Sequence, residues 1–361
     1  MRIAEAQITP FEARFKGDGF AVSYGRLTHL RHRLLRLVAE DGSEGWGEIE
    51  RKPATDEDAA ETEEDRLMPA LAGRTLAEVP TLAAKARAPE HGWPGCAVAL
   101  ALEMAWLDLI GRRTGLSVSA LLGGPAEGAV PALLGLSCET PESIAEQITE
   151  RGQGFANVQI KLGTGAIAED LVRIEAALGA LRPGQHLFAD FNGILPRELA
   201  LSALAAVTDP RLTWEEPCRT LDDNLACAAA LTRPVLLDQC IADLPTLMRA
   251  IGAGLPQGVT GISIKPFYLG GLSVARTARD LATAMGVPMR IDGPWCGPLA
   301  AAASVHLALG VPEDLLLFSA NLTDPLEASP SMLDASQPGR VATLPGSGLG
   351  PIPAALTGSR P

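Results

Sequence analysis

Five short apolar runs, each closed by a charged residue, divide the middle of the chain: VQIK (158–161), HLFAD (186–190), LTWE (212–215), PVLLD (234–238) and ISIK (262–265). Three of them end in the acidic residues Asp190, Glu215 and Asp238, at intervals of 25 (215 minus 190) and 23 (238 minus 215) residues. A strand, a helix and two short turns take roughly 25 to 30 residues, the repeat length of an eight-unit barrel of about 250 residues. The spacing therefore predicts consecutive β/α units whose strand ends meet at one rim.

The same pattern extends on both sides of these runs. The candidate strands are 131–137, 157–162, 186–191, 212–216, 234–238, 260–265, 288–292 and 314–319. The stretches between them are rich in alanine and leucine, have helical spacing and end at Gly or Pro. Short, fully apolar strands that alternate with helices indicate a parallel sheet. We therefore expect an α/β protein with a (β/α)7-8 TIM-type barrel over residues 126–330.

The two ends of the chain have a different pattern. Residues 1–50 alternate like antiparallel strands, 56–72 and 76–88 are helical in composition, and a long amphipathic helix follows before Gly123-Gly124. This predicts an α+β capping domain over residues 1–125. The tail, 331–361, is rich in Gly, Pro and Ser, and its RVATLP segment is typical of an edge strand. We expect the tail to return to the capping domain and complete it.

Composition restricts the class of partner. The chain has 361 residues, 47% of them hydrophobic, and a formal net charge of −13 without a basic block. That charge disfavours nucleic acid and anionic membrane as partners and favours small molecules. No apolar run of about 18 residues is free of charge, Gly or Pro, and the N-terminus has no signal or transit pattern. The sequence thus predicts a cytoplasmic protein.

The acidic strand ends predict a metal site. A single acidic residue there commonly caps the next helix, but Asp190, Glu215 and Asp238 lie on consecutive units. Side by side, they supply the oxygen ligands that Mg²⁺ prefers and leave positions open for water or substrate.

Lysines close two further strands, and they predict acid/base chemistry. A metal-bound carboxylate substrate loses its α-proton more easily because the cation stabilises the developing charge. A nearby cation also disfavours the charged form of a lysine, which can then act as a base. Lys161 and Lys265 fall on strands two and six, across an eight-stranded barrel. One lysine can remove the proton and the other can return it from the opposite face.

Several motifs along nearly the whole chain resemble those of the enolase superfamily, specifically the mandelate racemase and muconate lactonizing enzyme group. They are EDGSEGWGE (40–48), ALEMAWLDLIGRRTGLSVSALLGG (101–124), VQIKLG (158–163), ADFNG (189–193), WEEP (214–217), LDQ (237–239), ISIKPFYLGGL (262–272) and PGSGLGP (345–351). The resemblance implies metal ligands at Asp190, Glu215 and Asp238 and acid/base lysines at Lys161 and Lys265. It also implies one Mg²⁺ per subunit, with Mn²⁺ as the alternative ion, and a homo-oligomer.

The sequence departs from the family pattern beside these residues. The usual Lys-x-Lys is Gln159-Ile160-Lys161, and the acid that usually follows the third ligand is Gln239. Strand seven ends in Asp292 instead of a histidine base, which favours the lysine-pair branch related to muconate lactonizing enzyme. Asn192 and Gln239 are expected next to the ligands.

The resemblance also suggests substrate contacts. It places a loop, here Phe15 to Tyr24, over the site beside Ile49 to Pro53, although KGDGF is equally typical of a simple surface hairpin. Asp292-Gly-Pro-Trp295-Cys-Gly resembles a stretch of members that act on proline-type amino acids and betaines, and packing is the alternative role of Trp295. Asn321 stands where betaine-binding relatives carry an aromatic residue, which disfavours a quaternary ammonium substrate. The candidate substrate contacts are Tyr24, Asp292, Trp295 and Asn321.

These features predict a Mg²⁺-dependent isomerase that removes the α-proton of a small carboxylate substrate to form an enolate. Racemisation or epimerisation of an amino-acid or proline-type compound is favoured because both lysines are present. A lyase that dehydrates a hydroxyproline-type compound and a muconate-type cycloisomerase are alternatives. A non-catalytic, ligand-binding member of the family is the alternative from another class.

Overall fold

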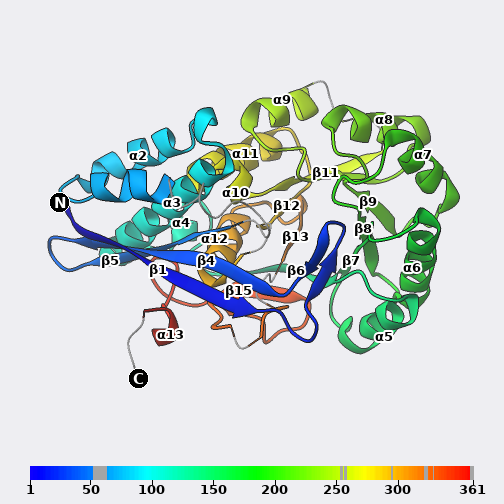
Figure 1. Cartoon of the computed structure of the whole chain (residues 1–361), viewed down its shortest axis with the longest axis horizontal. Helices are drawn as coiled ribbons and strands as arrows, with labels where there is room; N and C mark the ends of the chain where they lie inside the picture. The colour runs from blue at the N-terminus through cyan, green and yellow to red at the C-terminus, as the bar shows by residue number, and fades with distance from the viewer. Residues whose placement is uncertain are drawn as a thin grey trace.

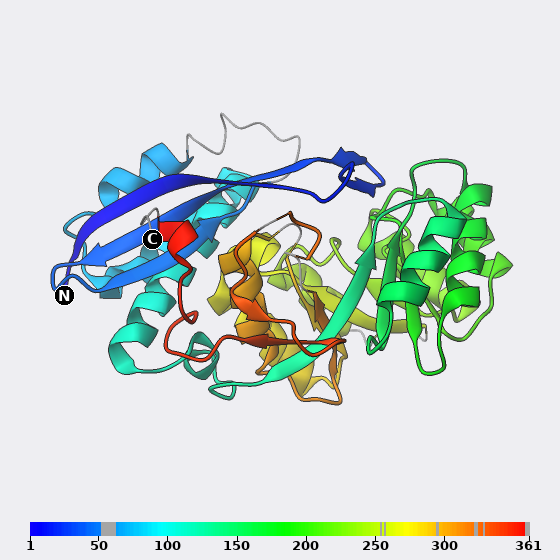
Figure 2. The same cartoon turned by 90° about the horizontal axis from the view of Figure 1, so that it is seen from below.

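The computed structural model of the protein describes residues 1–51, 63–252, 255, 258–293, 296–320, 324–327 and 329–357. An N-terminal body of antiparallel strands and helices lies beside a barrel of alternating strands and helices (Figure 1). The tail of the chain runs along both bodies (Figure 2). The expected division into a capping domain and a barrel is therefore visible in the arrangement of the elements.

The barrel contains the eight predicted strands. They are β6 (Ala129–Leu136), β7 (Asn157–Lys161), β8 (His186–Asp190), β9 (Leu212–Glu215), β10 (Val235–Leu237), β11 (Val259–Ile264), β12 (Met289–Ile291) and β13 (Leu316–Ala320). Each pairs in parallel with the next, and β13 pairs with β6 to close the cylinder. The predicted α/β barrel is thus confirmed.

Helices cover the outside of these strands. They are α5 (Pro141–Arg151), α6 (Ile167–Ala180), α7 (Arg197–Ala206), α8 (Leu221–Leu231), α9 (Leu244–Gly252), α10 (Pro266–Leu269), α11 (Leu272–Ala284) and α12 (Pro298–Ala308). Because each strand is covered on both faces, even its short apolar run is almost fully buried. Inside the cylinder, Leu133, Phe188, Leu236 and Phe318 form a separate apolar cluster. The rings of Phe188 and Phe318 meet edge to face with centroids 4.9 Å apart. The barrel interior is therefore packed below the strand ends.

The capping domain is a three-stranded antiparallel sheet backed by helices. Its strands are β1 (Ile3–Arg14), β4 (His29–Ala39) and β5 (Glu44–Ile49), in the order β1-β4-β5. Its helices include α2 (Val79–Ala86), α3 (Gly92–Thr114) and α4 (Val118–Leu121), with 3-10 turns η1 (Met68–Ala70), η2 (Leu76–Glu78) and η3 (Pro89–His91). Of the helix expected over 56–72, residues 63–67 are helical, and 56–62 lie outside the described residues.

Helix α3 is the core helix of this domain. The segment Pro89–Thr114 is long and apolar enough to cross a membrane, but 83% of its most apolar window is buried inside the protein. It packs against β5 through small residues, Gly45 and Gly47 on the strand and Ala101 and Ala105 on the helix. The apolar composition of α3 therefore reflects its place in the core.

The tail contacts both bodies. Strand β15 (Arg340–Thr343) pairs antiparallel with barrel strand β6, and β14 (Leu333–Asp334) pairs with β15. The RVAT strand therefore extends the barrel sheet, and its expected return to the first domain is wrong for this strand. The next residues do reach the capping domain, because the backbone amide of Leu349 donates a 2.7 Å hydrogen bond to Oδ1 of Asp108.

A second hairpin of the capping domain reaches over to the barrel. Strands β2 (Phe20–Val22) and β3 (Gly25–Leu27) form it, and Figure 2 shows it in dark blue at the far end of the N-terminal sheet. The carbonyl oxygen of Ala21 accepts a 2.9 Å hydrogen bond from the amide of Cys138, which follows β6. Arg26 lies 3.5 Å from Glu139. The loop expected over the site therefore touches the barrel rim.

Candidate metal and acid/base site

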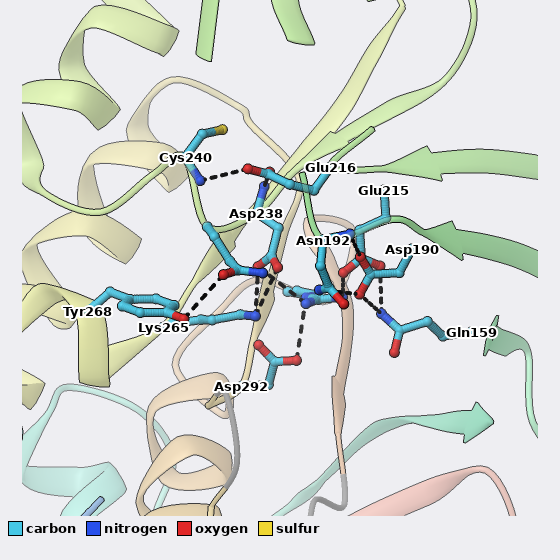
Figure 3. Close-up of polar contacts among 12 residues, drawn as sticks. Gln159, Asp190, Asn192, Glu215, Glu216, Asp238, Cys240, Lys265, Tyr268 and Asp292 are labelled. Atoms are coloured by element: carbon cyan, nitrogen blue, oxygen red, sulfur yellow. Dashed lines mark hydrogen bonds and ion pairs between the residues drawn. The ribbon is translucent and has the colours of Figure 1, made fainter. Parts of the chain in front are cut away.

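Three buried carboxylates converge at the C-terminal ends of adjacent strands. Asp190, Glu215 and Asp238 close or follow β8, β9 and β10, and one oxygen of each lies within 4.8 Å of the others. Their side chains are fully shielded from solvent, and they point toward a common centre (Figure 3). Three carboxylate oxygens at this separation fit a hard divalent cation, because such ions take oxygen ligands. The predicted metal-ligating residues are thus brought together.

The two lysines flank this trio. Lys161, at the end of β7, pairs with Asp190. Nζ of Lys265, which follows β11, lies 2.9 Å from both oxygens of Asp238. Because β7 to β11 are consecutive neighbours in the sheet, the order across the rim is Lys161, Asp190, Glu215, Asp238, Lys265.

Residues next to the ligands hold them in place. The amide of Asn192 donates a 2.8 Å hydrogen bond to Oδ1 of Asp190, and its side chain donates a 3.1 Å bond to Oδ2. The carboxylate of Glu216 accepts bonds from the amides of Asp238, at 2.5 Å, and Cys240, at 2.9 Å. Asn192 and Glu216 have positive φ values, 48° and 42°, which are unfavourable for a residue such as Glu and are concentrated at functional sites.

Sequence reasoning missed the role of Arg290. This residue lies in β12, is 1% exposed, and its guanidinium reaches two ligands. Nη1 is 2.7 Å from Oε1 of Glu215, an ion pair whose N–H is not aligned for a hydrogen bond, and Nη2 is 3.3 Å from Oδ1 of Asp238. A charged residue inside a strand that is buried on both faces was the signal that could have identified it.

The two departures from the family pattern also have defined contacts. Nε2 of Gln159 lies 2.7 Å from Oε2 of Glu215 and 3.3 Å from Oδ2 of Asp190. Oε1 of Gln239 accepts a 3.3 Å hydrogen bond from the hydroxyl of Tyr268. Gln159 therefore touches the ligands directly, whereas the hydrogen bond of Gln239 runs to Tyr268, which is itself beside Lys265.

Burial and nearby charges shift the pKa values of Glu215, Lys161 and Lys265. Burial raises the pKa of Glu215 to about 8, although Arg290 opposes the effect. Burial lowers the pKa of Lys161 and of Lys265, but the surrounding carboxylates outweigh it and raise both values overall. The carboxylates alone therefore keep both lysines protonated. A cation at the ligands would oppose this effect and favour the neutral form of a lysine.

A cavity of about 220 Å³ connects these groups to the surface, and its lining includes Phe20, Lys161, Lys265, Arg290 and Asp292. Of the candidate substrate contacts, Asp292 is buried there, with its Oδ1 free of a hydrogen-bond partner among the described residues. Tyr24 lies at the exposed turn of the β2–β3 hairpin. Trp295 and Asn321 lie outside the described residues, as do Lys52 and Pro53.

A buried carboxylate from the capping domain joins the two bodies. Glu48, on β5, accepts hydrogen bonds from the amides of Gly297 (2.6 Å), Leu299 and Ala300 (both 3.1 Å), at the start of α12. Nδ1 of His32 lies 2.6 Å from the same carboxylate. The capping domain therefore fixes the helix that follows barrel strand β12, which carries Arg290.

Comparisons with known proteins agree with this arrangement. Residues 6–123 match the mandelate racemase/muconate lactonizing enzyme N-terminal domain, and residues 143–350 match the enolase C-terminal domain-like family. The chain is 32% identical to a cis-3-hydroxy-L-proline dehydratase of Roseibium aggregatum, over 70% of this chain and 68% of the relative. It is 28% identical to an N-succinylamino acid racemase of Amycolatopsis, over 93% of this chain and 92% of the relative.

A solved structure has the same fold over nearly the full length. It is a member of the enolase superfamily from Roseovarius nubinhibens, complexed with magnesium. Its sequence is 27% identical, the alignment covers 98% of this chain and 97% of that chain, and the TM-score is 0.85.

Proposed function

Because the chain belongs to the mandelate racemase/muconate lactonizing enzyme group of the enolase superfamily, we propose that it is a Mg²⁺-dependent enzyme that removes the α-proton of a small carboxylate. Asp190, Glu215 and Asp238 are the ligands of the ion, and Mn²⁺ is the alternative metal. The main observation in support is the order of five side chains on adjacent strands, with both lysines lining one cavity.

The bound ion supplies positive charge that stabilises the enolate of the substrate. Lys161 and Lys265 bracket the ligand trio from its two sides, and each moves a proton at one face of the α-carbon. The lysine that starts neutral accepts the proton, and the protonated lysine on the other side donates one. This pairing produces inversion at the carbon, so racemisation or epimerisation is the favoured outcome.

The substrate class follows from the cavity and the relatives together. A cavity of about 220 Å³ suits a small molecule, and Asp292 offers a carboxylate to a substrate nitrogen. The named relatives act on an N-succinylamino acid and on a hydroxyproline. We therefore propose an amino-acid or proline-type substrate, with Tyr24, Trp295 and Asn321 as further candidate contacts.

Solvent deuterium tests this proposal directly. The protein is incubated with Mg²⁺ in D₂O with N-acyl amino acids, proline derivatives and dipeptides, and the α-proton signal is followed by NMR. The wild type should exchange this proton and interconvert the stereoisomers. Lys161→Ala and Lys265→Ala should each abolish interconversion while retaining exchange on opposite stereoisomers. Lys85→Ala, which removes an exposed lysine of α2, is the matched control.

Dehydration is the second candidate, because the 32% identical relative is a dehydratase. Elimination of water requires only one lysine as base, so it predicts a cyclic imine carboxylate (from the initial enamine) plus water from hydroxyproline-type substrates and full activity in one of the two alanine variants. Full interconversion in either lysine variant would refute the two-base mechanism. A protein that binds these compounds without any deuterium uptake would be a non-catalytic member.

A homo-oligomer is proposed from the family alone. Sedimentation of the purified protein would give its mass in solution, and a monomer at working concentration would contradict this expectation.

A further inference from the structure

Arg290 occupies a position from which it can act on the metal ligands without itself coordinating an ion. Its guanidinium carbon lies 5.6 Å from the centroid of the Phe318 ring, over the apolar cluster that fills the barrel. From there it reaches Oε1 of Glu215 at 2.7 Å and Oδ1 of Asp238 at 3.3 Å. Nε also lies 3.4 Å from Oδ2 of Asp292. A single buried cation thus contacts carboxylates from three strands.

Neither Lys161 nor Lys265 takes the place of Arg290 at Glu215. Lys161 pairs with Asp190, and Lys265 pairs with Asp238. Among the described residues, Arg290 is the one cationic group within ion-pair distance of Glu215. The central ligand of the trio therefore has a permanent positive partner that takes no part in proton transfer, because a guanidinium stays protonated in proteins.

Gln159 completes the support of the same carboxylate. Its amide approaches Oε2 of Glu215 and Oδ2 of Asp190, whereas Arg290 pairs with Oε1 of Glu215. A lysine at position 159, as in the Lys-x-Lys pattern, would bring a positive charge as well as a donor. A glutamine brings the donor alone. Arg290 supplies a charge at Glu215 from another strand.

We propose that Arg290 is a positioning residue that orients Glu215 and Asp238 for metal binding, beside Gln159, which orients Glu215 and Asp190. Arg290 carries the positive charge that Gln159 lacks. This inference rests on the proposed function, because it assumes that the trio holds a divalent ion. Groups that orient metal ligands from outside the coordination sphere typically change metal affinity 10- to 100-fold when they are removed.

Mn²⁺ binding, measured by electron paramagnetic resonance on metal-stripped protein, tests the inference without any substrate. Arg290→Met should weaken Mn²⁺ binding by about 10- to 100-fold. Arg290→Lys should weaken Mn²⁺ binding less than Arg290→Met does, because lysine retains the positive charge. Gln159→Lys should improve binding in the Arg290→Met background and not in the wild type. Arg279→Met removes a buried arginine that bonds the backbone of Leu122 instead, and it should leave Mn²⁺ affinity unchanged.

The outcomes separate the two proposals. A wild type that binds no Mn²⁺ would remove the basis of the proposed function. A wild type that binds Mn²⁺, with unchanged or tighter binding in a folded Arg290→Met variant, would overturn only the role of Arg290. Tighter binding would mean that the guanidinium competes with the ion. If Arg290→Met does not fold, as judged by circular dichroism, Arg290→Gln takes its place because it keeps a donor without the charge, and Mn²⁺ affinity equal to that of the wild type would again overturn the role.

Discussion

A Cβ atom at Gly47 would lie 2.1 Å from the carbonyl oxygen of Ala101, so strand β5 approaches helix α3 as closely as a backbone without side chains allows. Gly47→Ala should therefore destabilise the protein by about 3 kcal/mol, at the upper end of the cost of overpacking. Urea unfolding followed by circular dichroism measures the change. Gly179→Ala, on α6, is the control. An added Cβ there would have no atom within 4 Å outside its own helix, so the substitution should stabilise the folded protein by about 0.5–1 kcal/mol. Equal effects of the two substitutions would contradict the close contact.

Loss of the Glu48 carboxylate should weaken the contact between the capping domain and the barrel and so destabilise the protein. Glu48→Ala leaves the amides of Gly297, Leu299 and Ala300 without their acceptor, and a buried unsatisfied donor costs about 1–3 kcal/mol. We expect a loss of roughly 3 kcal/mol in the free energy of unfolding. Glu40→Ala, at an exposed position, should change it by less than about 0.5 kcal/mol. Similar changes in both variants would show that the Glu48 carboxylate at the start of α12 does not contribute to the free energy of unfolding.

His306 should make the protein sensitive to acid. Burial lowers the pKa of this histidine to about 4, whereas an unfolded chain titrates near 6.5. Below pH 6.5 the unfolded state therefore binds more protons, and stability falls as the pH drops from about 6.5 to 4, by roughly 3 kcal/mol at most. His306→Gln keeps an acceptor for the amide of Ser119, which lies 3.2 Å from Nδ1. The stability of the wild type relative to the variant should fall by up to roughly 3 kcal/mol between pH 6.5 and 4 and then level off, and a constant difference across this range would refute the prediction.

Divalent ions should stabilise the protein through the acidic trio. A ligand that binds only the folded state at 100 times its dissociation constant adds about 2.7 kcal/mol. Mg²⁺ should therefore raise the melting temperature of EDTA-treated protein in a scanning fluorimetry experiment. Asp190→Asn should remove most of this increase, whereas Asp334→Asn, at an exposed position of β14, should not. An undiminished increase in Asp190→Asn would place the ion elsewhere.

The barrel and the rim residues could be predicted because their signals are local in the sequence. Each buried strand is an apolar run closed by one charged residue, and the strand-to-strand spacing fixes the order around the cylinder. Lys161, Asp190 and Lys265 therefore occupy the expected strand ends. The edge strand in the tail was also recognisable, but its partner was not, because nothing in RVAT distinguishes pairing with β6 from pairing with the capping sheet.

The contacts that depend on distant parts of the chain could not be predicted. Arg290 meets Glu215 and Asp238, which are 75 (290 minus 215) and 52 (290 minus 238) residues away, only because the cylinder closes. Glu48 meets Gly297 across the boundary between the two bodies. In both cases a charged residue lies in a strand whose neighbours are buried, and this local anomaly indicates a partner without identifying it.

The cap on α12 also limits which substrates can bind at this end of the barrel. In many barrels the loops after strands seven and eight, with a helix N-terminus nearby, form a phosphate site. Here α12 follows strand seven, and its free amides already bond the carboxylate of Glu48. A phosphorylated metabolite would have to displace a buried anion of the protein itself, so this helix end is closed to phosphate esters.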